Sequence, residues 1–392
     1  MNEIEKLIQE LCPDGVEYRR LGEVADCYSG ATPKTSIATY WENGTIPWMN
    51  SGEVNLGRVY KTENKITKAG YDSCSTKMVP SHTVVIALAG QGKTRGTVAI
   101  TEIELCTNQS LCAIKVQNEF VNSYYLYHYL RGQYLTLRKI SSGDGTRGGL
   151  NQNMIRNFEI PLPPITIQEK IVEILDKFTS LEAELEAELE ARRKQYKYYR
   201  EKLLTFSPDD ENVRWATLGE ICELGTGSSN TNEELEDGKY PFFVRSQNVR
   251  YKNSYEYDET AIITSGDGVG VGKIFHYIEG KYALHQRAYR IKILDKNTIP
   301  KFVFYYMKST FYNYIINTAF SSSVTSIRRP MLIKFPIPLP PLSEQRRIVE
   351  ILDRFEALTN DLQAGLPAEI AARRQQYEYY REKLLTFKRK TV

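Results

Sequence analysis

One 16-residue segment occurs twice in this chain. Residues 191–206 read ARRKQYKYYREKLLTF and residues 372–387 read ARRQQYEYYREKLLTF, so the copies differ at two positions. Upstream of each copy lies a second matched segment, IPLPPITIQEKIVEILDKF at 160–178 and IPLPPLSEQRRIVEILDRF at 337–355. The period of about 180 residues far exceeds the roughly 20–50 residues of a solenoid repeat. The sequence therefore predicts two similar halves within one polypeptide.

Composition divides the chain into four alternating blocks. Residues 1–160 and 207–337 are rich in Gly, Thr, Val, Asn and Tyr and contain short apolar runs, which favours β-rich globular domains. In residues 161–206 and 338–392 apolar residues recur at spacings of three and four, as the seam of a coiled coil requires. We expect an α+β fold in which two long helices separate two β-rich domains and pack as an antiparallel coiled coil with pseudo-two-fold symmetry. The alternative is that each helix covers its own globular domain.

The repeat also reaches, more faintly, into the β-rich blocks. NQSLCAIK at 108–115 aligns with HQRAYRIK at 285–292, and the N-terminal residues 5–14 resemble residues 201–209. The chain thus begins where a helical block ends. This pattern predicts a cyclic repeat organisation in which the two chain ends lie close together.

Local signals predict where the helices begin and break. Thr166 and Ser343 follow the two LPP segments and are predicted N-caps, with Glu169 completing a capping-box pattern in the first copy. The Gly-Leu-Pro sequence at 365–367 should break the second helical block, because proline is tolerated only in the first turn of a helix. The first helical block should be continuous.

A four-residue unit repeats within the first helical block, with leucines at Leu181, Leu185 and Leu189 that are each followed by Glu-Ala. A solvated acidic face explains such a pattern. The pattern also suits a ruler, because each unit adds ~6 Å and turns the far end of the helix by a net ~40°.

Composition and motifs exclude several classes of protein. Six cysteines without a CxxC motif indicate reduced thiols, and four scattered histidines predict no metal centre. No apolar run approaches the ~18 residues of a membrane span and no signal-peptide pattern is visible, so we expect a cytoplasmic protein without a membrane partner. The formal net charge of +3 neither requires nor excludes nucleic-acid binding.

The sequence GQGKT at 90–94 resembles part of a nucleotide-binding P-loop. A P-loop needs a further glycine where Ala87 stands, and a helix after the loop, whereas residues 95–100 read as a strand. We therefore interpret this region as a glycine-rich strand–loop–strand. No catalytic pair of residues recurs in both halves, so we predict no catalytic residues.

The loops that differ between the halves are polar and basic. Arg, Asn and Gln can pair with guanine and adenine edges, and Lys and Arg can bind phosphates. For any single residue, an ordinary solvated loop is the alternative interpretation. The candidate DNA-binding residues are Lys93, Arg95, Asn108, Gln109, Arg147, Asn151, Lys273, Arg287, Arg328 and Arg329.

The near-identical helical segments retain surface residues in both copies, as two identical partners docking on one chain would require. The candidate docking residues are Arg192, Arg193 and Arg200 in the first copy and Arg373, Arg374 and Arg381 in the second.

The IPLPP(I/L)xxQ…IVEILD(K/R)F and RRxQYxYYREKLLTF segments closely resemble those of specificity (S) subunits of Type I restriction–modification enzymes. The resemblance runs the full length of the chain. It implies a non-catalytic DNA-binding subunit whose two globular domains each read one half of a bipartite, asymmetric DNA site. A helical scaffold that does not bind DNA is the alternative.

The resemblance also implies partners. Double-stranded DNA and two modification (M) methyltransferase subunits are expected, and restriction (R) subunits can join them to cleave unmodified DNA. S-adenosylmethionine would belong to the M subunit that methylates adenine, so this chain is expected to bind no cofactor. In some members tetrapeptide repeats in the central region set the DNA spacer, and Leu181–Arg192 looks like such an element.

Overall fold

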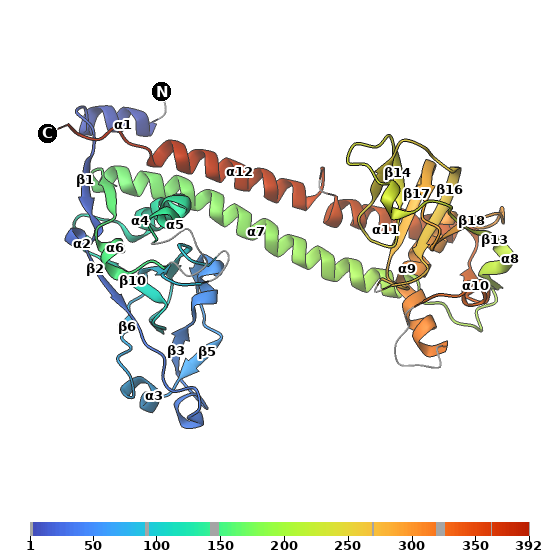
Figure 1. The fold of residues 1–392 in the computed structure, drawn as a ribbon, viewed down its shortest axis with the longest axis horizontal. Coiled ribbons are helices and arrows are strands. Elements are labelled where there is room, and N and C mark those ends of the chain that lie inside the picture. The colour runs from blue at the N-terminus through green and yellow to red at the C-terminus, as the bar shows by residue number, and fades with distance from the viewer. Residues whose placement is uncertain are drawn as a thin grey trace. The chain divides into compact units, whose positions relative to one another are not determined.

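The computed structural model describes residues 3–90, 94–141, 149–268, 270–318, 326–361 and 363–391. The chain divides into two compact units: unit 1 is Met1–Glu184 with Ile370–Val392, and unit 2 is Leu185–Glu369. Each unit therefore contains one β-rich block and parts of both helical blocks (Figure 1). The predicted mixture of helix and sheet, arranged in two halves, is confirmed.

Two sheets form the β-rich block of unit 1. Their strands are β2 (Ala25–Ser29), β3 (Ile46–Met49), β4 (Arg58–Val59), β5 (Asn64–Ile66), β6 (Met78–Val79), β7 (Val84–Ala87), β8 (Val98–Thr101), β9 (Leu105–Thr107) and β10 (Leu111–Val116). The larger sheet has the order β2-β10-β7-β8-β4 and the smaller one the order β5-β3-β9-β6. β7 and β8 are buried along their whole length and apolar except for Thr101, which explains their central positions.

The β-rich block of unit 2 repeats this frame. Its strands are β13 (Cys222–Thr226), β14 (Tyr240–Phe243), β15 (Arg250–Lys252), β16 (Tyr257–Ser265), β17 (Phe275–Leu284) and β18 (Ala288–Ile293). They form one sheet in the order β13-β18-β16-β17-β14-β15. The first four strands match β2, β10, β7 and β8 in order, so the faint sequence repeat reflects a common sheet.

Both units contain helices in addition to their sheets. Unit 1 contains α1 (Glu3–Leu11), α2 (Leu21–Val24), α3 (Lys68–Asp72), α4 (Ser123–Gly132), α5 (Tyr134–Ile140) and α6 (Gln152–Arg156), with 3-10 turns at Ala38–Tyr40 and Ser51–Leu56. Unit 2 contains α8 (Leu218–Ile221), α9 (Pro300–Thr318), α10 (Arg329–Ile333) and α11 (Leu342–Asn360), with a 3-10 turn at Thr231–Glu233. The remaining helices are α7 (Ile165–Leu203) and α12 (Leu366–Leu385).

The predicted helix continuity and helix break are both confirmed. α7 runs uninterrupted for 39 residues. α11 ends at Asn360 and α12 begins at Leu366, which places Pro367 in the first turn of α12, where its missing N–H costs nothing.

Within each unit, segments of the helical blocks pack on one another. In unit 1 the ring of Phe178 stacks on that of Tyr380 at 5.2 Å, and Glu182 pairs with Arg374 at 2.5 Å. The partners follow opposite chain directions, so these two segments are antiparallel. In unit 2, Tyr196 and Tyr199 stack on Phe355 at 6.0 and 5.7 Å.

The predicted N-caps are wrong. α7 begins at Ile165 and α11 at Leu342, so Thr166 and Ser343 lie inside the first helical turn. The carbonyl of Pro164 accepts from the N–H groups of Ile167 and Gln168, at 2.9 and 3.2 Å. The carbonyl of Pro341 accepts in the same way from two N–H groups of α11. The second proline of each LPP segment thus stands directly before the helix.

One buried glutamine joins each long helix to its β-rich block. The Gln168 amide nitrogen donates to the carbonyls of Phe120 and Pro163 at 2.9 and 2.8 Å, and its oxygen accepts from the Asn122 N–H at 2.9 Å. Gln168 is 0% exposed. These bonds fix the start of α7 against the loop before α4.

Gln345 occupies the same position in unit 2. It donates to the carbonyls of Asn297 and Pro340 at 3.0 and 2.8 Å and accepts from the Ile299 N–H at 2.8 Å. It is also 0% exposed. The glutamine that follows the LPP sequence in both copies is therefore a structural clamp.

The predicted proximity of the chain ends is confirmed within unit 1. The Val16 N–H donates to the Lys388 carbonyl at 2.8 Å, and the Lys390 N–H donates back to the Val16 carbonyl at 2.9 Å. Next to this contact, β1 (Glu17–Arg20) pairs antiparallel with β11 (Glu159–Leu162). The equivalent strands in unit 2 are β12 (Arg214–Thr217) and β19 (Pro336–Leu339).

The described residues contain neither a candidate membrane span nor a candidate metal cluster. No helix among the described residues is long and apolar enough to cross a membrane. In the same part of the chain, no group of three or more His, Cys, Asp or Glu side chains could hold a metal ion.

β7 and β8 flank the GQGKT sequence, as the strand–loop–strand interpretation predicts.

Candidate nucleic-acid interface

Four loop segments meet at one end of each sheet and form what we call a rim. Rim 1, in unit 1, consists of residues 29–32, 88–90, 108–110 and 149–152. Rim 2, in unit 2, consists of residues 226–230, 266–267, 285–287 and 326–329. Most of the candidate DNA-binding residues fall on these two rims.

Equivalent backbone hydrogen bonds build the two rims. In rim 1 the Leu88 N–H donates to the Ser110 carbonyl at 2.8 Å, and the Leu150 N–H donates to the Leu88 carbonyl at 2.9 Å. In rim 2 the Gly266 N–H donates to the Arg287 carbonyl at 2.9 Å, and the Ile327 N–H donates to the Gly266 carbonyl at 2.8 Å. Both rims therefore hold their segments in the same register.

A glycine makes the same close approach in each rim. A Cβ atom on Gly30 would lie 1.8 Å from the Thr107 carbonyl oxygen, and one on Gly227 would lie 1.8 Å from the Leu284 carbonyl oxygen. Any larger residue would push the first rim segment away from the strand. The glycines match each other in both sequence and structure.

The side chains on this common backbone differ. Asn108 and Ser110 of rim 1 correspond to His285 and Arg287 of rim 2. Asn151, the cap residue of α6, corresponds to Arg328, the cap residue of α10. Rim 1 is thus lined by neutral amides and hydroxyls among its described residues, while rim 2 carries arginines.

A side-chain contact that occurs in both rims shows the same contrast. The Thr32 hydroxyl donates to the Gln109 side-chain oxygen at 2.6 Å in rim 1. In rim 2 the Gln286 side-chain amide donates to Asn230 Oδ1 at 2.5 Å. A glutamine from the turn therefore contacts the first segment in both rims, through a different partner.

Asp267 and Arg287 of rim 2 form, with the adjacent Arg245, a charged cluster that sequence inspection did not identify. Asp267 accepts from Arg245 Nη1 at 2.8 Å through one oxygen and from Arg287 Nη1 at 3.2 Å through the other. Burial alone would raise the pKa of Asp267, but the two guanidinium groups outweigh it and hold the pKa below its usual value. The carboxylate therefore stays ionised and fixes both arginines.

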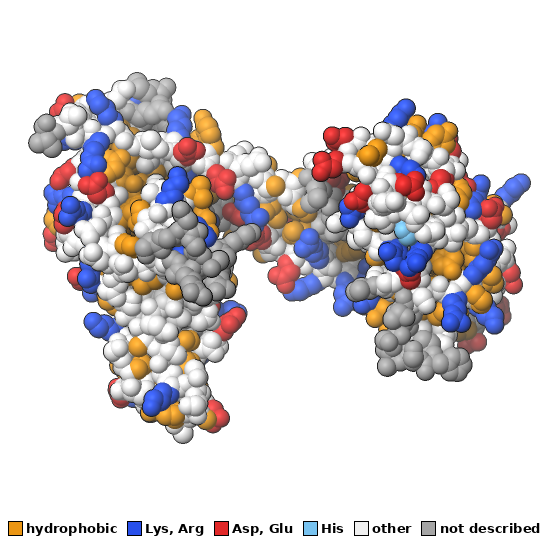
Figure 2. Space-filling view, in the orientation of Figure 1, with side chains coloured by type: hydrophobic (Ala, Val, Ile, Leu, Met, Phe, Trp, Pro, Cys, Tyr) orange, Lys and Arg blue, Asp and Glu red, His pale blue; other side chains and the backbone are white. Residues whose placement is uncertain are grey.

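These arginines line an open pocket of about 400 Å³, together with Asn230, Thr231, Asn232, His285 and Gln286. The imidazole Nδ1 of His285 accepts from the Arg287 N–H at 3.0 Å. Burial lowers the pKa of His285, and the charge of Arg245 lowers it further, so the ring is neutral near pH 7. Figure 2 shows Lys and Arg side chains on the visible face of unit 2, interleaved with acidic ones.

The remaining candidates are distributed as follows. Gln109, Asn151, Arg328 and Arg329 are exposed on the rims, and Asn108 is half-buried. Lys273 is exposed outside rim 2, with its ammonium 4.4 Å from the ring centroid of Tyr312. Lys93 and Arg147 lie outside the described residues.

The structure corrects the expectation that Arg95 lies on the DNA-binding surface. Its side chain is only 7% exposed, and the neighbouring Gly96 lies against Leu137 and Arg138 of α5. From this position the guanidinium is not presented on rim 1. The basic character of the loop suggested exposure because sequence shows residue type and not the direction in which the side chain points.

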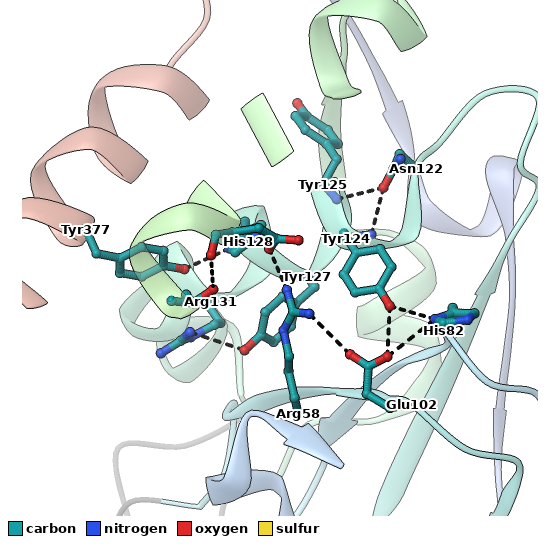
Figure 3. Close-up of polar contacts among 12 residues, drawn as sticks. Arg58, His82, Glu102, Asn122, Tyr124, Tyr125, Tyr127, His128, Arg131 and Tyr377 are labelled. Carbon is teal, nitrogen blue, oxygen red and sulfur yellow. Dashed lines mark hydrogen bonds and ion pairs between the residues drawn. The ribbon is translucent and has the colours of Figure 1, made fainter. Parts of the chain in front are cut away.

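A buried polar network links the β-rich block of unit 1 to its helices (Figure 3). His128 on α4 contacts Asp176 of α7 at 2.8 Å through Nε2 and the Tyr377 hydroxyl of α12 at 2.9 Å through Nδ1. Arg58 bridges Asp176 at 2.5 Å and Glu102 at 3.4 Å. One imidazole thereby joins three elements that are distant in sequence.

Burial shifts the charges of this network. His128 is 0% exposed, and burial lowers its pKa although Asp176 acts in the opposite direction. The pKa of Asp176 is also low, because its bonds to His128 and Arg58 outweigh the effect of burial. In unit 2, Tyr305 takes the place of His128 and donates to Asp353 at 2.5 Å.

The candidate docking arginines are largely engaged within their own units. Arg192 bonds Glu188 at 2.7 Å, and Arg374 bonds Glu182 at 2.5 Å. The guanidinium groups of Arg200 and Arg381 lie over the rings of Tyr196 and Tyr377, at 5.4 and 5.3 Å from the centroids. Arg373 donates to Gln376 at 3.0 Å. Arg193 is exposed.

Each repeated helical segment exposes a pair of adjacent tyrosines, which are not among the candidate docking residues. Tyr198 and Tyr379 are 58% and 61% exposed, while Tyr199 and Tyr380 are both 37% exposed. The rings within each pair meet edge to face, at 5.4 and 5.3 Å. The signal in the sequence was the repeated YY, whose second tyrosine alone fits the apolar seam.

The predicted ruler leucines lie on α7. Leu181 is 37% exposed, and Leu185 and Leu189 are half-buried. The leucines therefore retain apolar surface that is open to solvent.

Comparison with known proteins agrees with this repeated architecture. A family described as "Type I restriction modification DNA specificity domain" matches residues 13–191 and again 211–372. The chain is 35% identical over 291 residues to the Type I restriction enzyme EcoR124I/EcoR124II specificity subunit of Escherichia coli, covering 67% of this chain and 70% of that protein. It is 26% identical over 371 residues to the Escherichia coli EcoprrI specificity subunit, covering 88% and 89%.

Solved structures share the fold. An S subunit of a Type I restriction–modification system from M. genitalium has a TM-score of 0.64 at 16% identity, covering 95% of this chain and 96% of that one. A chain from a structural study of complex assembly and conformational transition of the type I R-M system has a TM-score of 0.57 at 19% identity, covering 95% and 97%. Since the family match occurs twice and spans most of the sequence, this chain belongs to the non-catalytic specificity subunits of Type I restriction–modification systems.

Proposed function

We propose that each unit reads one half of a bipartite, asymmetric DNA sequence through its rim. The observation that carries this proposal is the pair of rims, which share their backbone hydrogen bonds and differ in the side chains they present. A common frame suits a common ligand, the DNA duplex, while different side chains suit different base edges. In this proposal residues 1–160 and 207–337 are the reading domains.

The contacts of the rims come from residues of two chemical kinds. Asn108, Gln109 and Asn151 in rim 1 offer amides, which suit adenine edges. Arg287, Arg328 and Arg329 in rim 2 offer guanidinium groups, which suit guanine edges or phosphates. Lys273 is assigned to phosphate contact, because it is exposed outside the rim. Lys93 and Arg147 remain candidates from sequence alone.

The helical regions, 161–206 and 338–392, would hold the two readers apart. We propose that α7 pairs with α11 and α12 along an antiparallel coiled-coil seam with pseudo-two-fold symmetry. The Phe178–Tyr380 stack within unit 1 and the Tyr199–Phe355 stack within unit 2 support this pairing. The leucines at 181, 185 and 189 would then set the DNA spacer, because they lie on α7 at the point where the helix passes from unit 1 to unit 2.

The repeated segments would dock two M subunits. The exposed tyrosine pairs support this role, because they recur with nearly equal exposure in both copies, and Arg193 is exposed in the first copy. Aromatic side chains with open faces are common anchors of protein interfaces. The M subunits would bind S-adenosylmethionine and methylate adenine, and R subunits would join to cleave unmodified DNA.

A binding selection tests the reading function. The full chain, purified as a complex with its methyltransferase subunits, would be incubated with a random duplex library, and the bound DNA sequenced. We expect two short conserved blocks separated by a spacer of fixed length and random sequence. A single contiguous motif, or no enrichment together with salt-independent binding, would favour the scaffold alternative, because a DNA reader loses affinity steeply with salt.

A further inference from the structure

The pocket of rim 2 carries chemistry beyond a general contact with DNA. Its lining includes two arginines, a neutral histidine and the amides of Asn230 and Gln286, and the carboxylate of Asp267 bonds both arginines. We propose that Arg245, Asp267 and Arg287 together read one G·C base pair in the half-site of unit 2. This proposal rests on the proposed function and names the base pair that the site would take.

Each arginine is held in place while part of its donor set stays free for a ligand. Arg245 and Arg287 each use one terminal nitrogen on Asp267, at 2.8 and 3.2 Å. Their side chains remain 39% and 60% exposed. A guanidinium has five N–H donors in a planar fork, so each retains the pair of donors that a guanine edge accepts.

Three backbone hydrogen bonds fix the loops around the cluster. The Gly266 N–H donates to the Arg287 carbonyl at 2.9 Å, and the His285 N–H donates to the Phe243 carbonyl at 2.9 Å. The Gln286 N–H donates to the Ser229 carbonyl at 3.0 Å. These bonds tie the loops that carry all three charged residues, so little ordering is required when a ligand binds.

The carboxylate distinguishes a base pair from a phosphate. Asp267 lies between the two arginines and reduces the summed charge of the three residues to a single positive charge. A phosphate placed against both guanidinium groups would approach this carboxylate and be repelled. A G·C pair offers the O6 and N7 acceptors of guanine to an arginine and the N4 donor of cytosine to a carboxylate.

The equivalent place in rim 1 has a different composition. Ser110 stands in the position of Arg287 and Asn108 in that of His285. Among the described residues of rim 1, the turn at 108–110 carries no charged side chain. The inference therefore applies to the half-site of unit 2 alone.

The test uses the full chain in its methyltransferase complex and the binding selection described above. Arg245→Gln and Arg287→Gln should both lower the preference for G·C at one position of one half-site. The arginine that contacts the guanine edge should do so by about 5- to 150-fold, the range for one bidentate base contact, and the other arginine, which positions it through Asp267, by less. The other half-site should not change. Arg214→Gln is the matched control, because Arg214 is 57% exposed and bonds one carboxylate, Asp295, at 2.8 Å.

Asp267→Asn separates the two roles of the cluster. We expect weaker discrimination at the same position together with equal or higher affinity for unrelated DNA, because a negative charge has been removed. Uniformly weaker binding of all sequences by the arginine variants, with a smaller salt slope and an unchanged motif, would overturn the inference in favour of a phosphate site and leave the proposed function intact. Absence of a bipartite motif for the wild-type complex would instead remove the proposed function itself.

Discussion

Replacing Gln168 with methionine keeps the length of the side chain and removes all three of its hydrogen bonds. A hydrogen bond contributes about 0.5–1.5 kcal/mol net, so three lost bonds should lower the free energy of unfolding of unit 1 by about 1.5–4.5 kcal/mol. We expect the upper part of this range, because Gln168 is 0% exposed and the Asn122 N–H loses its acceptor in a part-buried place. At about 2–4 °C per kcal/mol, the midpoint of thermal unfolding should fall by several degrees.

The duplication supplies an internal replicate and a control. Gln345→Met should have an effect of similar size in unit 2, because its three hydrogen bonds match those of Gln168. Gln376→Met should change stability by less than about 0.5 kcal/mol, since Gln376 is exposed and accepts one bond, from Arg373 at 3.0 Å.

Calorimetry of the full chain measures the loss, and hydrogen exchange followed by mass spectrometry assigns it to a unit. Gln168→Met should expose amides around residues 118–130, and Gln345→Met those around 295–307. If Gln168→Met shifted the unfolding midpoint no more than Gln376→Met does, the clamp would not fix the helix to its β-rich block.

Three further predictions address partners, pH and spacing. Tyr198→Ala combined with Tyr379→Ala should weaken co-purification of methyltransferase subunits, because two exposed aromatic anchors are lost. The control, Thr205→Ala with Thr386→Ala at exposed matched positions, should not weaken it. Equal recovery of methyltransferase subunits with both double variants would place docking elsewhere. Burial lowers the pKa of His128 in the folded state, so the neutral imidazole stabilises the fold above the unfolded pKa of about 6.5, and this stabilisation is lost as the pH falls below that value. His128→Gln should flatten the dependence of stability on pH in this range, and an unchanged dependence would contradict the assignment. Deleting residues 185–188 should shorten the DNA spacer by about one base pair, since a four-residue helical unit rotates by a net ~40°; binding selection would show an altered half-site instead if the leucines were not a ruler.

The repeat in the sequence predicted the architecture well because it is strongest where the structure is most regular. The near-identical segments form the helices, and the proline at 367 accounts for the break between α11 and α12. The β-rich blocks were predicted only as a class, since their strands are short and pair across long separations, as β3 does with β9. Thr166 and Ser343 were misjudged because a proline carbonyl replaced the side-chain cap.

The candidate site was predicted in part. Residue types that suit base contact identified Gln109, Arg287 and Arg328, which the fold brings to equivalent rims. Arg95 has the same chemistry and is buried. Asp267 and Arg245 were missed because their role depends on an ion pair between two residues 22 positions apart, which no local pattern reveals. Charge and side-chain type can be read along a sequence, whereas convergence depends on the fold.

The central claim, that one chain carries two independent readers, is tested most directly by mapping adenine methylation across the genome of the host. The account predicts a bipartite asymmetric motif whose methylation disappears when the gene is deleted. Exchange of residues 1–160 for those of a related subunit should then change one half of the motif and leave the other half and the spacer intact. A methylation pattern unaffected by the deletion, or an exchange that alters both halves together, would contradict the account.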